Sequence, residues 1–192
     1  MDYYQQQYVA PEPKKPSLFR RLLCFVIVVA IVIGCSFAIR TYVVEPFQIP
    51  SGSMEDTIMT GDMVFAEKVS YWSGSPQKGD VVVFSDPQVP SRVLIKRVIA
   101  TEGQTVNLVD GVLYIDGVAQ TESYTKGNSY PLSAIGSANI TYPYTVPSGY
   151  VWVMGDNREN SSDSRYFGSV KTSTVFGKAF LIYWPLNHLG TL

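Results

Sequence analysis

The sequence predicts a mainly β domain that follows one membrane-spanning helix near the N-terminus. A run of 18 residues without a charged side chain lies between Arg21 and Arg40. Short β-rich runs separated by turn residues fill most of the remaining chain, and no long amphipathic helix is evident after residue 41. We therefore expect mainly β structure after the helix, as coiled antiparallel sheets or a partial barrel.

The uncharged run, LLCFVIVVAIVIGCSFAI, has the length and flanks of a membrane anchor. As a helix it is about 27 Å long, close to the roughly 30 Å hydrocarbon core of a bilayer. Four basic residues precede it and one follows closely, which predicts a cytoplasmic N-terminus in the cell membrane. We expect a cytoplasmic tail over residues 1–18, a single-pass anchor over residues 19–40 and an extracytoplasmic domain over residues 41–192.

Two alternatives for this run are a buried core helix and the apolar region of a cleaved signal peptide. Residues 36–38 (Ser-Phe-Ala) and 32–35 (Val-Ile-Gly-Cys) resemble two kinds of cleavage site. The run is longer than the apolar region of about 7–15 residues that is usual in signal peptides. We therefore prefer an uncleaved anchor in the lipid bilayer.

Charge is divided unevenly between the two parts of the chain. Only 16% of the 192 residues are charged, and the formal net charge is −1. Residues 1–40 carry a net charge of +3, whereas residues 41–192 carry −4. Because a nucleic-acid-binding protein needs a basic surplus to neutralise phosphates, this balance argues against nucleic acid as a partner.

Cysteine and histidine are too scarce in the external domain for several common kinds of site. Cys24 and Cys35 both lie in the apolar run, about 16 Å apart along a helix, which is beyond the roughly 7 Å that a disulfide tolerates. The single histidine, His188, lies close to the end of the chain. We therefore expect no disulfide, no metal site and no histidine-based catalytic triad in residues 41–192.

The expected strands follow one another with turn signals between them. Asp110-Gly111 and Asp116-Gly117 are dipeptides typical of tight turns. The β-rich runs are, in chain order, Met63–Glu67, Val81–Phe84, Val93–Ile99, Val106–Val109, Val112–Ile115, Val151–Met154 and Val175–Tyr183.

Residues 120–148 interrupt this pattern. They are rich in Ser, Thr, Tyr, Gly and Pro and show little periodicity, which predicts a long loop or hairpin excursion. Tyrosines in this stretch either pack on the sheet or form a contact surface. They are Tyr124, Tyr130, Tyr142 and Tyr144.

A short segment just beyond the anchor offers a candidate nucleophile. Residues 47–54 read Phe-Gln-Ile-Pro-Ser-Gly-Ser-Met, with two serines bracketed by proline and glycine. Pro50 fixes one backbone angle and Gly52 permits close approach, so the turn can hold a hydroxyl rigidly. Taken alone, the same pattern is also common in ordinary loops.

The expected strand over residues 93–99 offers a candidate base. Lys96 and Arg97 are adjacent cations in an otherwise apolar run. Successive strand residues point to opposite faces, so Lys96 faces the interior or a cleft if Arg97 faces water. Burial lowers the pKa of a lysine and makes its neutral amine available as a base. An edge strand with protective charges is the alternative.

A third segment, residues 155–168, is dense in Asp, Asn, Ser and Arg between a hydrophobic strand and an aromatic pair. It is either a solvated loop or a buried network of hydrogen bonds and ion pairs that supports a nearby site. With no histidine available in the body of the domain, a lysine is the obvious base for a serine nucleophile.

These segments resemble, in order and spacing, the signature boxes of bacterial type I signal peptidases (leader peptidases), which are serine endopeptidases with a Ser/Lys dyad. They are Pro50–Met54, Gly79–Phe84, Lys96-Arg97 and Gly155–Gly168. With the anchor, the resemblance covers nearly everything from residue 19 to residue 185. It implies the coiled β fold of that family and an enzyme without a cofactor or metal.

By motif position, the resemblance implies that Ser53 is the nucleophile and Lys96 the general base. The Ser51 hydroxyl and the Ser53 backbone N–H would form the oxyanion hole, whose donors act on charge that develops in the tetrahedral intermediate. Ser161 would hydrogen-bond the lysine and orient it. Asp163 and Arg165 would form the ion pair that holds their loop beside the dyad.

The resemblance also implies a substrate class, exported preproteins with signal peptides that are cut after an Ala-x-Ala site. The bound peptide would add as a β-strand beside residues 47–51 and 95–96. An anchor that keeps the site near the membrane surface raises its local concentration around such substrates. The residues implied to line the shallow substrate pockets are Phe47, Ile49, Ile58 and Ile95.

The chain departs from the family pattern directly after Met54. The family often continues with a variable residue and then Pro-Thr-Leu, whereas this chain has Glu-Asp-Thr-Ile over residues 55–58. Two carboxylates close to the nucleophile bear on its electrostatic field and on the preferred cleavage site.

Two other functions are compatible with parts of this pattern. A self-cleaving repressor-type peptidase shares a Ser/Lys pair and this kind of β fold, but it carries a DNA-binding segment where this chain has an apolar run. A non-catalytic anchored module that binds signal or pilin-like segments is the alternative from another class. The presence of Ser51, Ser53 and Lys96 argues against that module.

Overall fold

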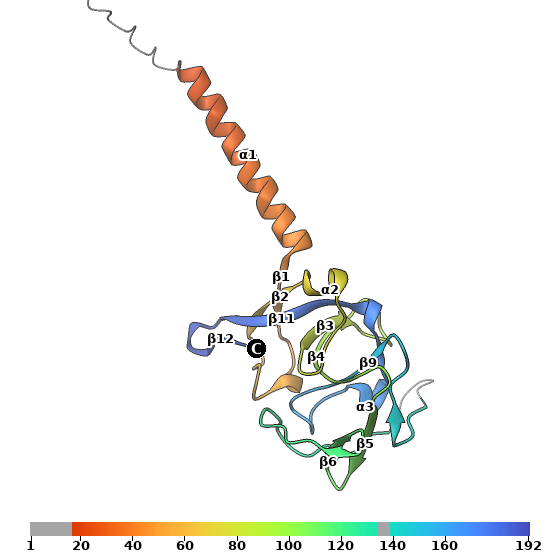
Figure 1. The fold of residues 1–192 in the computed structure, drawn as a ribbon. Helices are drawn as coiled ribbons and strands as arrows, with labels where there is room; N and C mark the ends of the chain where they lie inside the picture. Colours follow the sequence, from red (N-terminus) through yellow and green to blue (C-terminus); the bar gives the residue numbers. More distant parts are fainter. Residues whose placement is uncertain (1–16, 134–138) are drawn as a thin grey trace, which may run out of the picture. The chain divides into compact units, whose positions relative to one another are not determined.

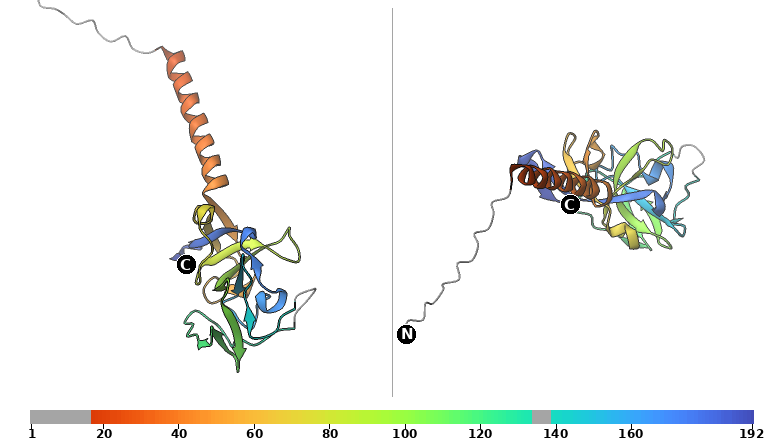
Figure 2. Two further views of the ribbon diagram at one scale, coloured as in Figure 1. Left: turned by 45° about the vertical axis from the view of Figure 1, so that its right-hand side comes forward. Right: turned by 90° about the horizontal axis from the view of Figure 1, so that it is seen from above.

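The computed structural model describes residues 17–133 and 139–192 (Figures 1 and 2). The chain divides into two compact units, of which the first extends to Ile39 and the second comprises Arg40–Leu192. Nearly all of the predicted tail over residues 1–18 lies outside the described residues, as does the stretch 134–138 within the predicted excursion.

Helix α1, Leu18–Tyr42, contains the apolar run and has no buried residue. Its 25 residues extend about 37 Å at the usual rise of an α-helix, which exceeds the thickness of a hydrocarbon core. It is the only helix in the described ranges that is long and apolar enough to cross a membrane. No proline interrupts this segment, so its backbone hydrogen bonds continue along the whole helix, and β1 begins at Val44.

Most of the second unit is one large antiparallel sheet. Its strand order is β1-β2-β11-β3-β4-β9-β10, with β12 paired to β11. The end strands β1 and β10 do not pair with each other in the described part of the chain, so this sheet is not a closed barrel. Its strands are β1 (Val44–Gln48), β2 (Met63–Glu67), β3 (Val81–Ser85), β4 (Val93–Thr101), β9 (Tyr150–Met154), β10 (Val170–Lys171), β11 (Val175–Trp184) and β12 (Gly190–Thr191).

A second antiparallel sheet has the order β7-β6-β5-β8. Asp110-Gly111 and Asp116-Gly117 join β5 to β6 and β6 to β7, and all four residues have positive φ, as tight hairpin turns require. The predicted excursion returns to this sheet, because β8 pairs with β5. The strands are β5 (Thr105–Val109), β6 (Val112–Ile115), β7 (Val118–Ala119) and β8 (Tyr144–Thr145).

Tyrosines of the excursion mostly pack on the domain. Tyr142 and Tyr144 lie against the ring of buried Trp152, with ring centroids 6.1 Å and 4.8 Å away. Tyr124 lies under the guanidinium of Arg97. Tyr130 is 51% exposed. For Tyr124, Tyr142 and Tyr144, the alternative of packing on the sheet therefore holds.

Helices are short after α1 throughout the described residues. They are α2 (Ser70–Ser73), α3 (Ser164–Phe167) and the 3-10 turns η1 (Gly52–Met54), η2 (Thr172–Thr174) and η3 (Leu186–His188). The prediction of a mainly β domain after an N-terminal apolar helix is confirmed.

Strand β4 lies in the middle of the large sheet, between β3 and β9 (Figure 1). Apolar clusters cover both of its faces, with Ile95 in one cluster and Val98 in another. This placement buries every residue from Ile95 to Ala100. The alternative of an edge strand for this segment is therefore wrong.

Candidate active site

Ser53 and Lys96 meet inside the second unit although 43 residues separate them in the sequence. The Nζ atom of Lys96 lies 2.6 Å from the Oγ atom of Ser53 and 2.9 Å from the carbonyl oxygen of Ile95. Both side chains are buried, at 6% and 3% exposure for Ser53 and Lys96. A neutral lysine amine at this distance can accept the serine hydroxyl proton.

Burial lowers the pKa of Lys96 to about 8, because the ammonium form loses its hydration. The carboxylates of Asp163 and Asp156 act in the opposite direction and limit this shift. A substantial fraction of this lysine is therefore neutral in mildly alkaline solution, whereas an ordinary lysine with a pKa near 10.4 is almost fully charged there.

Arg97 does not face water, so the condition under which the strand pattern placed Lys96 in the interior is not met, although Lys96 is buried. Its side chain is buried and forms a bidentate ion pair with Asp156, with Nε and Nη2 at 2.9 Å and 2.7 Å from the two carboxylate oxygens. Thr57 also donates to Asp156 over 2.6 Å. Because both faces of β4 are covered, the adjacent Lys96 and Arg97 are both buried, on opposite faces. One carboxylate thereby joins the strand of the lysine to the turn that follows Ser53.

The turn Gly52–Met54, here called the nucleophile turn after the role that the resemblance implies for Ser53, is held by the segment after β9. The backbone N–H of Asn157 donates to the carbonyl of Ser53 over 3.1 Å, and its side-chain amide donates to the carbonyl of Gly52 over 3.0 Å. A side chain at Gly155 would collide with the Ser53 carbonyl and with Ser161. Glycine is therefore the residue that allows β9 to approach the nucleophile turn this closely.

Ser51 immediately precedes η1 and is exposed, with an extended backbone. Its side chain makes no capping hydrogen bond to η1. The hydroxyl is therefore not engaged by the turn, and it lies two residues before Ser53. This placement is compatible with the implied role of Ser51 in an oxyanion hole.

Asp163 and Arg165 form a buried bidentate ion pair, with both N–O distances 2.9 Å. Asp163 also accepts the Gly155 N–H over 3.0 Å, and Arg165 donates to the Arg158 carbonyl over 2.7 Å. The structure thus has the ion pair that the resemblance implies, and it holds residues 155–165 together. Of the two alternatives for this segment, the buried network is the one observed.

The implied hydrogen bond from Ser161 to Lys96 is not formed. The Ser161 hydroxyl is buried and has no hydrogen-bond partner among the described residues. Lys96 instead contacts Ser53 and the Ile95 carbonyl. Ser161 nevertheless lies beside the nucleophile turn, since its side chain and the Ser53 carbonyl both border Gly155.

A groove of about 110 Å³ lies between residues 47–50 and 93–95. Three of the four implied pocket residues, Phe47, Ile49 and Ile95, line it. Ile58 does not; it is fully buried in the adjoining apolar cluster. The groove is small beside the roughly 300–1,000 Å³ of typical ligand pockets, so it suits small side chains.

Several residues of this arrangement could not be assigned individually from the sequence. Glu122 forms an ion pair of 2.7 Å with buried Arg158, and it comes from the predicted excursion. Asn157, Asp156 and Thr57 fix the nucleophile turn as described above. The density of polar residues in 155–168 was the sequence signal that pointed to Asp156 and Asn157. No such signal in the sequence pointed to Thr57 or Glu122.

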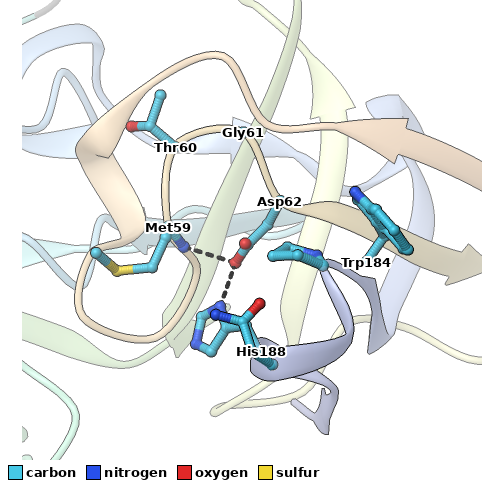
Figure 3. A pocket seen from close by; sticks show the side chains of 8 residues that line it. Met59, Thr60, Gly61, Asp62, Trp184 and His188 are labelled. Atoms are coloured by element: carbon cyan, nitrogen blue, oxygen red, sulfur yellow. Dashed lines mark hydrogen bonds and ion pairs between the residues drawn. The ribbon is translucent and has the colours of Figure 1, made fainter.

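His188 lies in a different pocket (Figure 3). Its Nδ1 atom is 2.7 Å from Asp62 Oδ2, which also accepts the Met59 N–H over 2.8 Å. The pocket is further lined by Trp184 and has a volume of about 470 Å³. Among the described residues, Lys96 rather than His188 is the potential base that contacts Ser53.

A serine hydroxyl hydrogen-bonded to a buried lysine, on a mainly β domain, has the geometry of a serine hydrolase with a lysine base. A family model described as "Signal peptidase, peptidase S26" matches residues 19–184. The chain therefore belongs to the signal peptidase family, peptidase S26. Together with the relatives below, this confirms the resemblance and makes the protein a serine endopeptidase of the signal peptidase I type.

Relatives match this chain over most of its length. Probable signal peptidase I-1 of Synechocystis sp. is 39% identical over 162 residues, covering 80% of this chain and 78% of that protein. Signal peptidase I of Leptolyngbya laminosa is 34% identical over 189 residues, covering 95% and 89%. A crystal structure of a signal peptidase I from Enterococcus faecalis V583 has 34% sequence identity and a TM-score of 0.42, covering 54% of this chain and 95% of that chain.

Proposed function

We propose that this protein is a membrane-anchored endopeptidase that removes signal peptides from exported preproteins after an Ala-x-Ala-like site. Ser53 is its nucleophile and Lys96 its general base. The observation that carries the proposal is the 2.6 Å contact between these two buried side chains. The name signal peptidase I, which both sequence relatives carry, supports the same substrate class.

In the acylation step, Lys96 takes the hydroxyl proton of Ser53 as Oγ attacks the carbonyl carbon of the scissile bond. The tetrahedral oxyanion is stabilised by the Ser53 backbone N–H and the Ser51 hydroxyl. Collapse of the intermediate breaks the C–N bond, and Lys96 returns its proton to the leaving amine. The products are the free mature protein and an ester between Ser53 and the signal peptide.

Hydrolysis then regenerates the enzyme. Lys96 accepts a proton from a water molecule, and the resulting hydroxide attacks the ester carbonyl. The C–O bond of the ester breaks, and Ser53 Oγ takes back the proton that Lys96 holds. The signal peptide leaves with a new carboxylate, and the two steps together consume one water molecule.

The groove and the apolar helix account for the choice of substrate. Residues 47–50 and 93–95 form the walls of a small groove, and Ile95 in one wall directly precedes Lys96. An extended peptide can pair with the strand that forms this wall. Helix α1 anchors the enzyme in the cell membrane with its N-terminus in the cytoplasm, which follows from the basic residues before it. The catalytic domain, residues 41–192, then lies outside, near the membrane surface where signal peptides emerge.

Cleavage of a preprotein by the full-length protein in detergent micelles tests this proposal. Wild type should release the signal peptide, whereas Ser53→Ala and Lys96→Ala should abolish release. Ser75→Ala and Lys78→Ala are matched controls, because they remove the same side chains at exposed positions in other parts of the domain. Equal cleavage by wild type and both dyad variants would falsify the dyad. A peptide bond cut elsewhere than after the Ala-x-Ala site would contradict the proposed specificity.

A further inference from the structure

The residues directly after the nucleophile turn carry charges that the proposed mechanism does not use. Glu55 and Asp56 form ion pairs with Lys126, whose Nζ atom lies 3.9 Å and 3.3 Å from their carboxylate oxygens. These three residues are here called the charged cluster. Their side chains are 25%, 72% and 49% exposed for Glu55, Asp56 and Lys126, so a bound peptide can reach them.

The charged cluster is fixed to the nucleophile turn from two sides. The Glu55 carboxylate covers Gly52, because a Cβ atom at Gly52 would lie 2.7 Å from Glu55 Oε1. On the other side, the Lys126 backbone donates to the Asp156 carbonyl and accepts from the Arg158 N–H, each over 2.8 Å. Asn157, between those two residues, donates to the Ser53 carbonyl. The cluster is therefore a fixed neighbour of the dyad.

Ser53 and Lys96 follow the two walls of the groove along the chain, since Pro50 and Ile95 line it. Along the chain, the groove wall over residues 47–50 leads into the nucleophile turn, and the turn leads into Glu55 and Asp56. A substrate whose residues before the scissile bond occupy the groove continues past Ser53 toward the cluster. An extended chain advances about 3.3 Å per residue, so the three residues after the scissile bond span about 10 Å, which is comparable to the Debye length of about 8 Å at physiological salt.

We propose that the charged cluster sets the preference of the enzyme for charge in the first residues of the mature protein. This inference rests on the proposed function and adds a specificity to it. Two carboxylates and one ammonium give the cluster a net charge of −1. Basic residues at the second and third positions after the scissile bond are therefore favoured over acidic ones. The size expected for exposed charge pairs is about two- to fivefold in kcat/KM.

The sign of the preference follows the charge of the cluster, which gives two variants with opposite outcomes. Lys126→Ala leaves two carboxylates without their cation and strengthens the preference for basic residues. The double variant Glu55→Gln, Asp56→Asn leaves Lys126 alone, so the cluster becomes positive and the preference reverses toward acidic residues. A structural effect of either substitution alters the cleavage of all peptides and does not produce this reversal.

The test uses three peptides with one Ala-x-Ala site and Lys, Gln or Glu at the second and third positions after it. They are cleaved by the full-length protein in micelles of an uncharged detergent, and each kcat/KM is divided by that of the Gln peptide. Wild type should prefer Lys over Glu, Lys126→Ala more strongly, and the double variant should prefer Glu. Added NaCl should bring all three ratios toward one, since exposed charges are screened.

Two charge-removing variants at exposed positions elsewhere serve as controls. Lys78→Ala and Glu102→Gln should keep the wild-type ratios, so that a change confined to the cluster variants assigns the effect to the cluster. Ratios that are equal in wild type and in both cluster variants overturn this inference while leaving the proposed function intact. Failure to cleave any of the three peptides overturns both.

Discussion

The Nζ atom of Lys96 lies 2.6 Å from the Oγ atom of Ser53, and neither side chain is more than 6% exposed. The lysine reaches this position because β4 is a central strand whose two faces are both covered. The same burial that brings the amine to the hydroxyl also disfavours its charge. The position of Lys96 and its protonation state therefore have one structural cause, which is burial in β4. The pH dependence of the enzyme should reflect this burial.

Activity should rise with pH as Lys96 loses its proton. Burial lowers its pKa to about 8, so kcat/KM should increase up to this pH and level off above it. The measurement is kcat/KM for one peptide between pH 6 and 10, with wild type and Lys96→Arg compared. The arginine variant should be inactive throughout, because its guanidinium stays charged. A flat wild-type profile would contradict lysine as the base.

Stability should show the complementary effect of the same group. The folded protein holds Lys96 with a lowered pKa, so between about pH 8 and 10.5 the unfolded chain binds more protons and stability rises with pH. At pH 7, holding Lys96 buried in its charged form costs free energy, at about 1.4 kcal/mol per unit by which its pKa is lowered. Replacement by methionine removes this cost and should stabilise the protein at pH 7 by on the order of 3 kcal/mol.

Thermal unfolding of wild type and Lys96→Met at pH 7 and pH 10 measures this effect. The melting temperature of the variant should exceed that of wild type at pH 7, and the difference should shrink at pH 10. Lys78→Met is the control, since this lysine is exposed and should give the same difference at both values of pH. A lower melting temperature for Lys96→Met at pH 7 would contradict a lysine that is costly to bury in its charged form.

Asp163 and Asp156 hold the pKa of Lys96 up, Asp163 more strongly than Asp156. Replacing either with asparagine should therefore move the pH–activity profile to lower pH, further for Asp163→Asn. Each change also leaves a buried arginine without its counter-charge, which typically costs about 3–5 kcal/mol of stability. The profile distinguishes the two effects, because partial unfolding lowers activity at every pH without moving its midpoint.

Circular dichroism at each pH identifies the folded fraction, to which the rates of these two variants are referred. Asp80→Asn provides a comparison, since it also breaks an ion pair, with Lys178, but Asp80 is not among the main charges that shift the pKa of Lys96. Its midpoint should coincide with that of wild type. Midpoints that move to higher pH in Asp156→Asn or Asp163→Asn would contradict the electrostatic argument.

The sequence was sufficient for the elements with strong local patterns, and it led to the choice of Ser53 and Lys96 as the proposed dyad. The apolar helix, the Asp-Gly turns and all seven β-rich runs appear as expected, apart from shifts at their ends. These features depend on local composition and on backbone conformations that only a few residues adopt. The predicted pairing of Ser53 with Lys96 followed from the lack of another base and from the resemblance to a family.

The supporting contacts were not predictable in the same way, because they join segments that are distant in the sequence. Nothing local to Thr57 or Glu122 indicates that one donates to Asp156 and the other pairs with Arg158. In a strand with one covered face, a buried Lys96 would leave Arg97 in water, but both faces of β4 are covered and both side chains are buried. Which strands lie beside β4 is set by the order of the whole sheet.

His188 pairs with Asp62 at the edge of another pocket (Figure 3). His188→Ala removes one hydrogen bond to a buried carboxylate, so the free energy of unfolding should fall by about 1–3 kcal/mol. Because His188 does not contact Ser53 or Lys96, kcat/KM per folded enzyme should remain close to that of wild type. Chemical denaturation and peptide cleavage on the same preparation provide both values. A folded variant that has lost about a thousandfold or more in kcat would instead assign His188 to the chemistry, as in a histidine-based triad, and would remove Lys96 from its role as base.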